Sequence, residues 1–375
     1  MNTKQYFMYT IIAWNKDIIN RKEYKMIKQY ILNKTPIRTS NNYKINDITL
    51  DINKLELNIS NNIEIINDEN EKLDIKIDKE YYDILNSKIG LSFEKFYNIK
   101  IIVKENQNIK NPIIIKYDFN NNDVLINKIE LLFEKNSEAR FILKYESADN
   151  ALINFNYLKQ VNTIKENAKG KVIIANLINN KSDSFIAVEN SIEDNASLSY
   201  NFIDLGGRNK ISNYYTKLLG YNSENKFNNI YFGTDKDMID MNYHVEILGK
   251  KSVCNMEVQG AIDGFAKKSF KGTIDFIEGS VNSIGEENEN CVILSDNANS
   301  KSLPMLLCHE ESVQGAHGVS SGKIDEDKLF YIMSKGISES DAKKLIIKAN
   351  FNKILQNIDD INLQNEIIEI IENKI

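Results

Sequence analysis

The chain has 375 residues, of which 42% are hydrophobic and 27% charged, with a formal net charge of −6. A chain of this length can bury a sizeable core and is expected to form two or three structural parts. The composition is ordinary for a soluble globular protein, which argues against disorder or a membrane span. Lys and Glu are interspersed along the whole length, so no basic surface for nucleic acid is indicated.

Residues 1–33 are predicted to be a short helical preface that ends before Pro36, because apolar residues recur at helical spacing. Those residues are Tyr24, Ile27 and Ile31. The apolar run Phe7–Trp14 is too short to cross a bilayer and is not followed by a small-residue cleavage site, which favours a cytoplasmic protein. Residues 41–70 are rich in Asn and Ile, and this pattern leaves edge strands and loop equally open.

From Ile99 to about residue 308 the pattern changes to short runs of alternating apolar residues separated by Asn, Asp, Gly and Ser, which predicts strands. Examples are Ile99–Val103, Ile113–Ile115, Ile129–Phe133, Phe141–Tyr145, Ile174–Leu177, Leu198–Phe202 and Tyr243–Val245. No helix-length stripe interrupts these runs. A doubly wound α/β fold needs helices between its strands and is therefore disfavoured.

A weak internal repeat helps to choose among all-β architectures. Three times a polar turn leads through a small residue into an alternating strand, and the small residues, Ala139, Ala196 and Ser252, are almost evenly spaced. If one coil takes on the order of 20 residues, this spacing corresponds to three coils of a parallel β-helix. A β-sandwich would also give short strands with frequent turns, so the repeat favours the solenoid only modestly.

The chain after Lys323 is predicted to form helices. Asp325 can cap a helix over 326–335 that ends at Gly336, and Ser338 can cap the next one. Two apolar stripes follow on that second helix: one with Ala342, Leu345, Ile346 and Ala349, the other with Ile347, Phe351, Ile354, Leu355 and Ile358. A final segment carries Ile367, Ile368, Ile371 and Ile375. A helical bundle this short cannot bury all of these apolar side chains within itself. We therefore expect the helices to dock on the β part, on a partner protein, or on both.

Histidine and cysteine are scarce, which limits the metal chemistry of the chain. The three cysteines, Cys254, Cys291 and Cys308, are too widely spaced for a metal cage and are expected to be small buried hydrophobes. His244 is expected to be a hydrogen-bonded structural residue of a strand. His317 lies among Gly, Ala and Ser residues, and a loop with so little cover leaves its imidazole accessible as a ligand shared across an interface. From the residues alone, a plain turn is still the favoured interpretation of this segment.

One acidic cluster suggests a different function. Asp235, Asp237 and Asp240 could serve as acids of a β-helix enzyme that acts on polysaccharide. Their spacing fits no calcium-loop template, and Asp is common in turns because its side chain hydrogen-bonds the local backbone. The turn interpretation is favoured, and the enzyme is kept as the alternative function.

The segment from Pro304 to Ile337 carries a longer and more specific pattern. It reads P-M-L-L-C-H-E-E-S-V-Q-G-A-H-G-V-S-S-G-K-I-D-E-D-K-L-F-Y-I-M-S-K-G-I. This segment resembles the C-terminal signature of the SufB/SufD family of iron-sulfur cluster assembly proteins. The likeness extends over about residues 195–358. The details resemble SufD, since Ala298 stands where SufB has its cysteine, and Ala316 and Gly318 replace the glutamates that flank the later histidine in SufB.

The resemblance implies a right-handed parallel β-helix core over 86–322, a short N-terminal helical or mixed part over 1–85, and a C-terminal helical domain over 323–375 that docks an ATPase. It implies a SufB-like paralogue and a SufC-like ABC ATPase as partners, with no nucleic acid or membrane, and a possible homodimer when isolated. The candidate ATPase-docking residues are Leu329, Phe330, Met333, Leu345 and Ile346.

In this family a SufD histidine and a SufB cysteine contribute to a cluster at the junction of the two proteins, and that histidine corresponds to His317. Cys308 is a weak second candidate, because Gly315 stands where some SufD proteins carry a cysteine. The chain is therefore expected to be a scaffold subunit and not an enzyme, with no tightly bound cofactor of its own and a transient iron-sulfur cluster in the complex. A purely structural interaction module, independent of His317, is the third possibility.

Overall fold

The computed structural model describes residues 30–32, 48–50, 63–82, 95–120, 123–147 and 153–375. Most of the predicted N-terminal helix lies outside these residues. Its last part is not helical, because Tyr30–Leu32 forms strand β1, which pairs antiparallel with β2, Ile48–Leu50. Aromatic and β-branched residues favour a strand once a partner strand is available, which helical spacing alone does not reveal.

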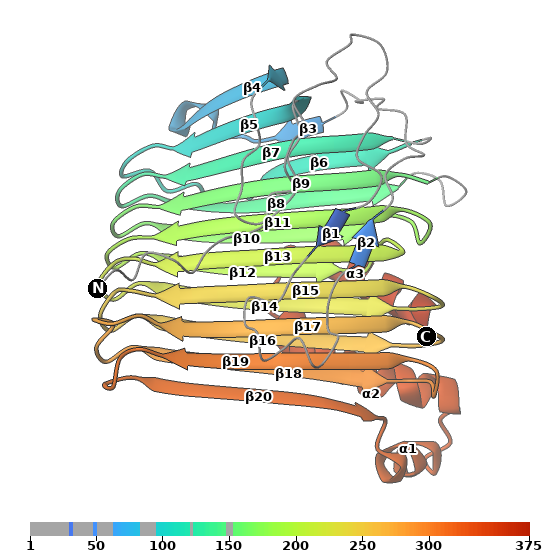
Figure 1. Ribbon diagram of the computed structural model, residues 1–375. Coiled ribbons are helices and arrows are strands. Elements are labelled where there is room, and N and C mark those ends of the chain that lie inside the picture. The colour runs from blue at the N-terminus through green and yellow to red at the C-terminus, as the bar shows by residue number, and fades with distance from the viewer. Residues whose placement is uncertain (1–29, 33–47, 51–62, 83–94, 121–122, 148–152) are drawn as a thin grey trace, which may run out of the picture.

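From residue 63 to residue 323 the described chain forms a β-solenoid of about eight turns, which confirms the mainly β prediction (Figure 1). Each turn contributes one strand to each of two nine-stranded sheets. Sheet 1 contains β3 (Ile63–Ile66), β6 (Ile113–Phe119), β8 (Glu138–Ser147), β10 (Lys169–Leu177), β12 (Ser197–Asp204), β14 (Glu224–Gly233), β16 (Val253–Ile262), β18 (Ile284–Ile293) and β20 (Gln314–Lys323). Sheet 2 contains β4 (Leu73–Tyr82), β5 (Lys95–Val103), β7 (Val124–Phe133), β9 (Phe155–Ile164), β11 (Asp183–Ile192), β13 (Asn209–Leu218), β15 (Met238–Ile247), β17 (Lys267–Phe276) and β19 (Asn299–Cys308).

The two ends of the solenoid differ. From β5 and β6 onward all neighbouring strands within each sheet are parallel, whereas β3 and β4 join the first coils antiparallel. The β-helix core was expected to begin at residue 86, and these two strands extend the sheets to residues before that position. A 3-10 turn, Asn70–Lys72, connects them. At the other end, β19 and β20 are the last strands of their sheets, with no further strand beside them in the described chain.

The period of the solenoid is longer than predicted. One coil carries the chain from Glu138 to its register partner Lys169, and a later one carries it from Ser197 to Glu224. The coil length predicted from the sequence is therefore wrong, and the spacing between Ala139 and Ala196 covers two coils and not three. Each coil needs more residues than predicted because its two strands are about ten residues long.

One corner of each coil up to β18 is made by a residue with a positive φ angle. These residues are Asn106, Asn136, Asn167, Asn195, Asn222, Lys251 and Asn282, with φ between 53° and 61°. Asn tolerates this left-handed conformation better than most residues. Successive side chains also form a ladder, since Asn136 Nδ2 donates to Asn106 Oδ1 at 2.9 Å and Asn167 Nδ2 donates to Asn136 Oδ1 at 3.1 Å. From the second of these corners onward, a small buried Ser or Ala follows the turn residue, which lets the coils stack closely.

Alternate residues of both sheets point into the solenoid and form a continuous apolar core. Aromatic rings pack against one another inside it, for example Tyr214 tilted against Phe227 at 4.1 Å and Phe227 edge-on against Tyr243 at 4.7 Å between ring centroids. This core holds the two sheets together and fixes the register of the strands.

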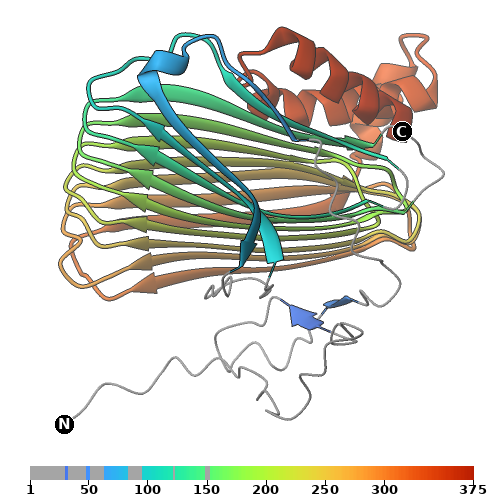
Figure 2. The same cartoon turned by 90° about the horizontal axis from the view of Figure 1, so that it is seen from above.

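Three helices follow the last strand: α1 (Glu326–Met333), α2 (Glu339–Leu355) and α3 (Ile361–Lys374). α2 and α3 pack on the outer face of sheet 1 (Figure 2), whereas α1 buries none of its residues and contacts α2. The predicted caps are confirmed. Asp325 accepts hydrogen bonds from the backbone N–H groups of Asp327 and Lys328, and Ser338 accepts one from Asp341. None of these helices combines the length and apolar character needed for a membrane span, and the same holds throughout the described residues.

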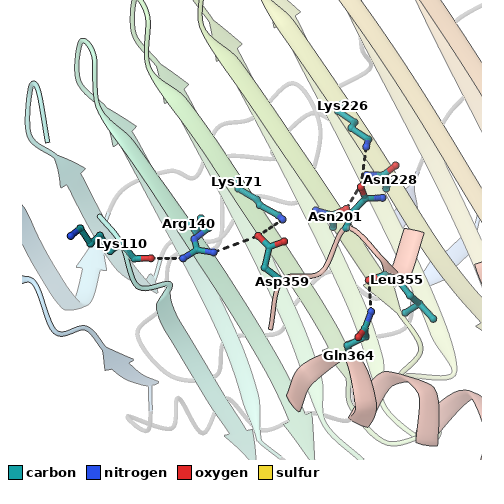
Figure 3. Close-up of polar contacts among 10 residues, drawn as sticks. Lys110, Arg140, Lys171, Asn201, Lys226, Asn228, Leu355, Asp359 and Gln364 are labelled. Carbon is teal, nitrogen blue, oxygen red and sulfur yellow. Dashed lines mark hydrogen bonds and ion pairs between the residues drawn. The ribbon is translucent and has the colours of Figure 1, made fainter. Parts of the chain in front are cut away.

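An apolar cluster joins α2 and α3 to sheet 1. It contains Ile347, Phe351, Ile354 and Ile367 on the helices and Ile173, Ile203, Ile230 and Phe232 on the strands. Polar contacts at the connection between α2 and α3 add to it, because the Asp359 carboxylate accepts from Arg140 and Lys171 of neighbouring strands (Figure 3). One of the two apolar stripes predicted for α2 therefore docks on the solenoid.

Candidate functional site

The segment around His317 is a strand and not the loop that its small residues predicted. Residues 314–323 form β20, and every one of them pairs in parallel register with a residue of β18. Gly, Ala and Ser have low strand propensity, but the neighbouring strand supplies hydrogen bonds that the sequence alone does not show. Pro304 lies within β19, the strand that precedes β20 in the chain.

The His317 side chain belongs to the inward-facing row of β20. A Cβ atom added to Gly315, two residues earlier, would lie 2.7 Å from the Leu306 side chain and 3.1 Å from the Phe276 ring, both of which belong to the apolar interior or pack against it. Alternate residues of a strand share a face, so His317 follows the same direction. Because no later coil of the described chain covers it, the residue is exposed, and its side chain makes no hydrogen bond or ion pair with the described residues.

Glu287 is the register partner of His317 on β18, and its carboxyl group lies inside the solenoid. The side chain is 1% exposed, and neither carboxylate oxygen has a hydrogen-bond partner among the described residues. Burial, reinforced by the nearby Glu289 charge, raises the pKa of Glu287 to about 8. Gly272 on β17 makes the space for this group, since a Cβ at that position would lie 1.9 Å from Glu287 Oε1.

A second buried carboxylate lies two residues further along β18 and is fully paired. Glu289 contacts Lys268 at 2.7 Å, accepts from the Tyr231 hydroxyl at 2.8 Å and accepts from Ser302 at 3.0 Å. These partners come from three different strands. The interior beneath β20, the last strand of sheet 1, thus contains two carboxyl groups. Glu289 has hydrogen-bond and ion-pair partners, whereas Glu287 has none among the described residues.

The cysteines divide into two groups. Cys254 and Cys291 are buried, as predicted, and burial raises the pKa of both thiols, so neither is an ionised nucleophile at neutral pH. Cys308 ends β19 and is exposed, so the prediction that it is a buried hydrophobe is wrong. No hydrogen bond joins Cys308 to His317 within the described residues.

The predicted docking residues on the C-terminal helices are accessible to different degrees. Phe330 and Leu345 are 73% and 47% exposed, Met333 is also exposed, and Leu329 and Ile346 are half-buried. Tyr331 and Ile361 are further large exposed side chains on these helices. Leu345 of the first α2 stripe thus stays accessible to solvent, although Ala342 of the same stripe is buried, and the other stripe packs on sheet 1.

The acidic cluster at 235–240 has structural contacts, but only Asp235 lies in the predicted turn, because Asp240 belongs to β15. Asp235 has a φ of 51° at a corner of the solenoid. The Asp237 carboxylate accepts from the backbone N–H of Thr234 and pairs with the buried Lys210 at 2.8 Å. Asp240 pairs with a different buried lysine, Lys271, at 3.3 Å. With both inner carboxylates engaged in separate ion pairs, the geometry gives no support to an acid–base pair for sugar chemistry.

Two placements were not foreseen from the sequence. Glu287 carries no local signal beyond the alternating pattern E-x-E, which is visible at Glu287 and Glu289. His244 does lie in a strand, but its Nε2 atom has no hydrogen-bond partner among the described residues, contrary to the expectation of a satisfied structural histidine. It lies instead beside Asp275, close to which His309 also comes.

Residues 117–350 match the family described as SUF system FeS cluster assembly, SufBD core domain. The chain is 25% identical over 178 residues to the iron-sulfur cluster assembly protein SufD of Escherichia coli K12, a match that covers 47% of this chain and 41% of that protein. It is 24% identical over 165 residues to SufD of Bacillus subtilis 168, covering 44% and 38%.

A SufBD family protein of Pyrococcus horikoshii is 38% identical over 81 residues, covering 22% of this chain and 18% of the relative. Each of these matches spans less than half the length of the curated relative. The matched family region contains most of the solenoid, all of β20 and most of α2. The chain therefore belongs to the SufBD family of the SUF iron-sulfur cluster assembly system, as a SufD-like member.

Proposed function

We propose that this chain is a scaffold subunit of a SUF-type assembly complex, that it pairs with a SufB-like paralogue and a SufC-like ABC ATPase, and that it contributes His317 to a cluster-assembly site at the junction with the paralogue. The observation that carries the proposal is the exposed imidazole of His317 on the last strand of sheet 1 in the described chain. In this proposal the chain acts in the cytoplasm and has no catalytic activity by itself.

The open end of the solenoid supports pairing with another protein. All ten residues of β20 are exposed, and one edge of this strand has no neighbour in the described chain. An exposed strand edge presents unpaired N–H and C=O groups that another strand can complete. The small side chains of β20 allow a partner backbone to approach closely. A SufB-like paralogue is the proposed occupant, and a second copy of this chain can take its place when the protein is isolated.

The donor set supports a shared site. An imidazole nitrogen is a good ligand for iron, but one such ligand cannot hold a cluster, which needs several thiolate or imidazole donors. Cys308 is exposed and remains a weak second candidate from this chain. The remaining ligands are therefore proposed to come from the paralogue, with the cluster as transient cargo.

The helices support ATPase docking. α1 and α2 present Phe330 and Leu345 to solvent, while the opposite side of α2 is fixed to sheet 1. A partner bound to these side chains would be connected to sheet 1, and so to β20, through the apolar cluster that joins α2 and α3 to that sheet. We propose that ATP-driven movement of the ATPase reaches the His317 junction by this route.

Co-expression tests the proposed assembly. When this chain is produced with the SufB-like paralogue and the SufC-like ATPase from the same genome, a tag on the ATPase should recover all three proteins as one stable species in size-exclusion chromatography. Recovery of the ATPase and paralogue without this chain would contradict the proposal. The same would follow if this chain eluted alone or only with itself in the presence of both partners.

A further inference from the structure

Four polar side chains from two neighbouring coils lie inside the solenoid at its middle. Asn156 on β9 and Ser184 on β11 are register partners in sheet 2. Asn176 on β10 and Asp204 on β12 are register partners in sheet 1. All four are at most 1% exposed. Each points inward, because the residue two positions away along its strand belongs to the apolar core, namely Leu158, Ile174, Ile186 and Phe202.

A hydrogen bond across the interior shows which of these residues lie opposite each other. The Tyr200 hydroxyl on β12 donates to Gln160 Oε1 on β9, and Tyr200 is the register partner of Val172 on β10. The strands of the two sheets run in opposite directions (Figure 1). Four residues back from Gln160 is Asn156, and four residues on from Val172 is Asn176. These two amides therefore lie opposite each other, and their register partners lie opposite each other one coil further on.

Four atoms of this group are buried without a hydrogen-bond partner among the described residues. They are both polar side-chain atoms of Asn156, the Oδ1 atom of Asn176 and the Oγ atom of Ser184. The amide nitrogen of Asn176 is already engaged, since it donates to Asp204 Oδ1 at 2.7 Å, which leaves its oxygen as the unpaired atom. Buried polar atoms in folded proteins are nearly always paired, and leaving one unpaired is costly.

A second polar row in the same interior shows that such groups pair directly where they meet. Its amide nitrogens donate to the next residue of the row at 3.0, 2.7 and 2.7 Å, and the row consists of Gln160, Asn162, Asn190 and Thr216. In the group around Asn156 the residues are neighbours in the same way, yet no such bond joins the two amides to each other or to the hydroxyl in the described chain. A small polar ligand between them would supply the missing hydrogen bonds.

The unpaired donors and acceptors match a water molecule. The Asn156 amide nitrogen and the Ser184 hydroxyl can donate, and the oxygens of Asn156 and Asn176 can accept. A water molecule also both donates and accepts, and a buried water typically makes about three hydrogen bonds. A cation would bond only the oxygens and would leave the Asn156 N–H group unpaired. An apolar ligand would satisfy none of these atoms.

We propose that Asn156, Asn176 and Ser184 bind a buried water molecule that connects two coils and both sheets in the middle of the solenoid. A bridging water is nearly as favourable in enthalpy as a direct hydrogen bond. It would hold β9 and β11 against β10 at a position where the side chains do not reach one another. The site shares no residue with the proposed assembly function and does not depend on it.

A high-resolution crystal structure of the unaltered full-length chain tests the proposal directly. It should show a water oxygen about 2.7–3.2 Å from Asn176 Oδ1, from Ser184 Oγ and from one polar atom of Asn156. A direct hydrogen bond between the two amides, or a space without density, would show that the proposal is wrong. A density peak with contacts of about 2.3–2.6 Å to the oxygens would identify a cation and would also overturn it.

Ser184→Val and Ser184→Thr test the site in solution. The two side chains have the same shape, so any overpacking costs them equally, but only Thr keeps the hydroxyl. The Thr variant should unfold at a temperature about 2 °C or more above that of the Val variant, because the hydroxyl keeps its hydrogen bond to the water. Ser191→Val and Ser191→Thr are the matched control pair, since Ser191 is on the same strand but points outward, and they should differ less.

The sign of the difference decides between the interpretations. If Ser184→Val is as stable as Ser184→Thr or more stable, the Ser184 hydroxyl has no partner inside the solenoid and the proposal is wrong. If neither variant folds, the crystal structure of the unaltered chain still gives the answer. Co-expression with the proposed partners does not bear on either measurement, so the two proposals can fail independently.

Discussion

Glu287→Gln should remove a large contribution to the stability that the chain loses as the pH rises from 4.5 to 8. In the unfolded chain this carboxyl has a pKa near 4.5, whereas burial in the solenoid raises it to about 8. Between these values the folded state holds a proton that the unfolded state has lost, so the unaltered protein loses stability as the pH rises. The contribution lost is about 3 kcal/mol by pH 7 and about 5 kcal/mol at pH 9.

Urea unfolding followed by circular dichroism at a series of pH values measures this effect. The free energy of unfolding of Glu287→Gln should fall much less than that of the unaltered chain between pH 5 and pH 9. A buried Gln can have a cost of its own, but that cost does not vary with pH. Glu286→Gln is the matched control, because Glu286 is the preceding residue on β18 and is exposed, and its profile should follow the unaltered chain. Parallel profiles for Glu287→Gln and the unaltered chain would show that Glu287 is not a buried, protonated acid.

Leu345→Glu combined with Phe330→Glu should abolish recovery of this chain with the ATPase. Both side chains are large, apolar and exposed on the helices proposed to dock that partner. A charge placed in the apolar centre of an interface would be desolvated without a partner, which typically weakens binding by two or more orders of magnitude. Because neither side chain is in the core, the unfolding temperature of the double variant should stay within about 2 °C of the unaltered value.

Ile361→Glu provides the control for this experiment. It introduces the same chemical change at an exposed apolar side chain of α3, outside the predicted docking set. The control should copurify with the ATPase as the unaltered chain does. If the double variant still copurifies in equal amount, or if the control is lost to the same extent, the docking face has been placed wrongly on these helices.

The helix starts and the strands are predicted correctly from the sequence, because residues close together in the chain determine them. Asp325 and Ser338 cap the first turns of α1 and α2 through contacts with residues at most three positions away, as predicted. Gly336 has a positive φ angle, but α1 ends earlier than predicted, at Met333, with Ser334 as its C-cap. The strands are predicted for the same reason. Apolar and polar residues alternate along each strand because one of its faces is buried and the other is not. The true period is also present in the sequence, as an Asn-Ser or Asn-Ala pair in most coils, but so short a pair does not stand out from the many other Asn residues.

Groups brought together by stacking of coils could not be predicted in this way. Glu287 is buried opposite Gly272, and these residues come from consecutive strands of different sheets, β18 and β17. His244, Asp275 and His309 lie on three successive coils, and the register of the strands places each histidine beside the carboxylate. The error at His317 has the same origin, because a run of Gly, Ala and Ser becomes a strand only through the neighbouring strand β18.

The central claim is that His317 supplies a ligand to a cluster formed between this chain and its paralogue. It is tested most directly by iron and acid-labile sulfide analysis of the co-expressed three-protein complex after anaerobic reconstitution. His317→Ala should reduce both contents at least tenfold without dissociating the complex, while His309→Ala, which removes the other exposed histidine of this region, should leave them unchanged. Equal iron and sulfide contents in the His317→Ala complex and the unaltered complex would contradict the claim.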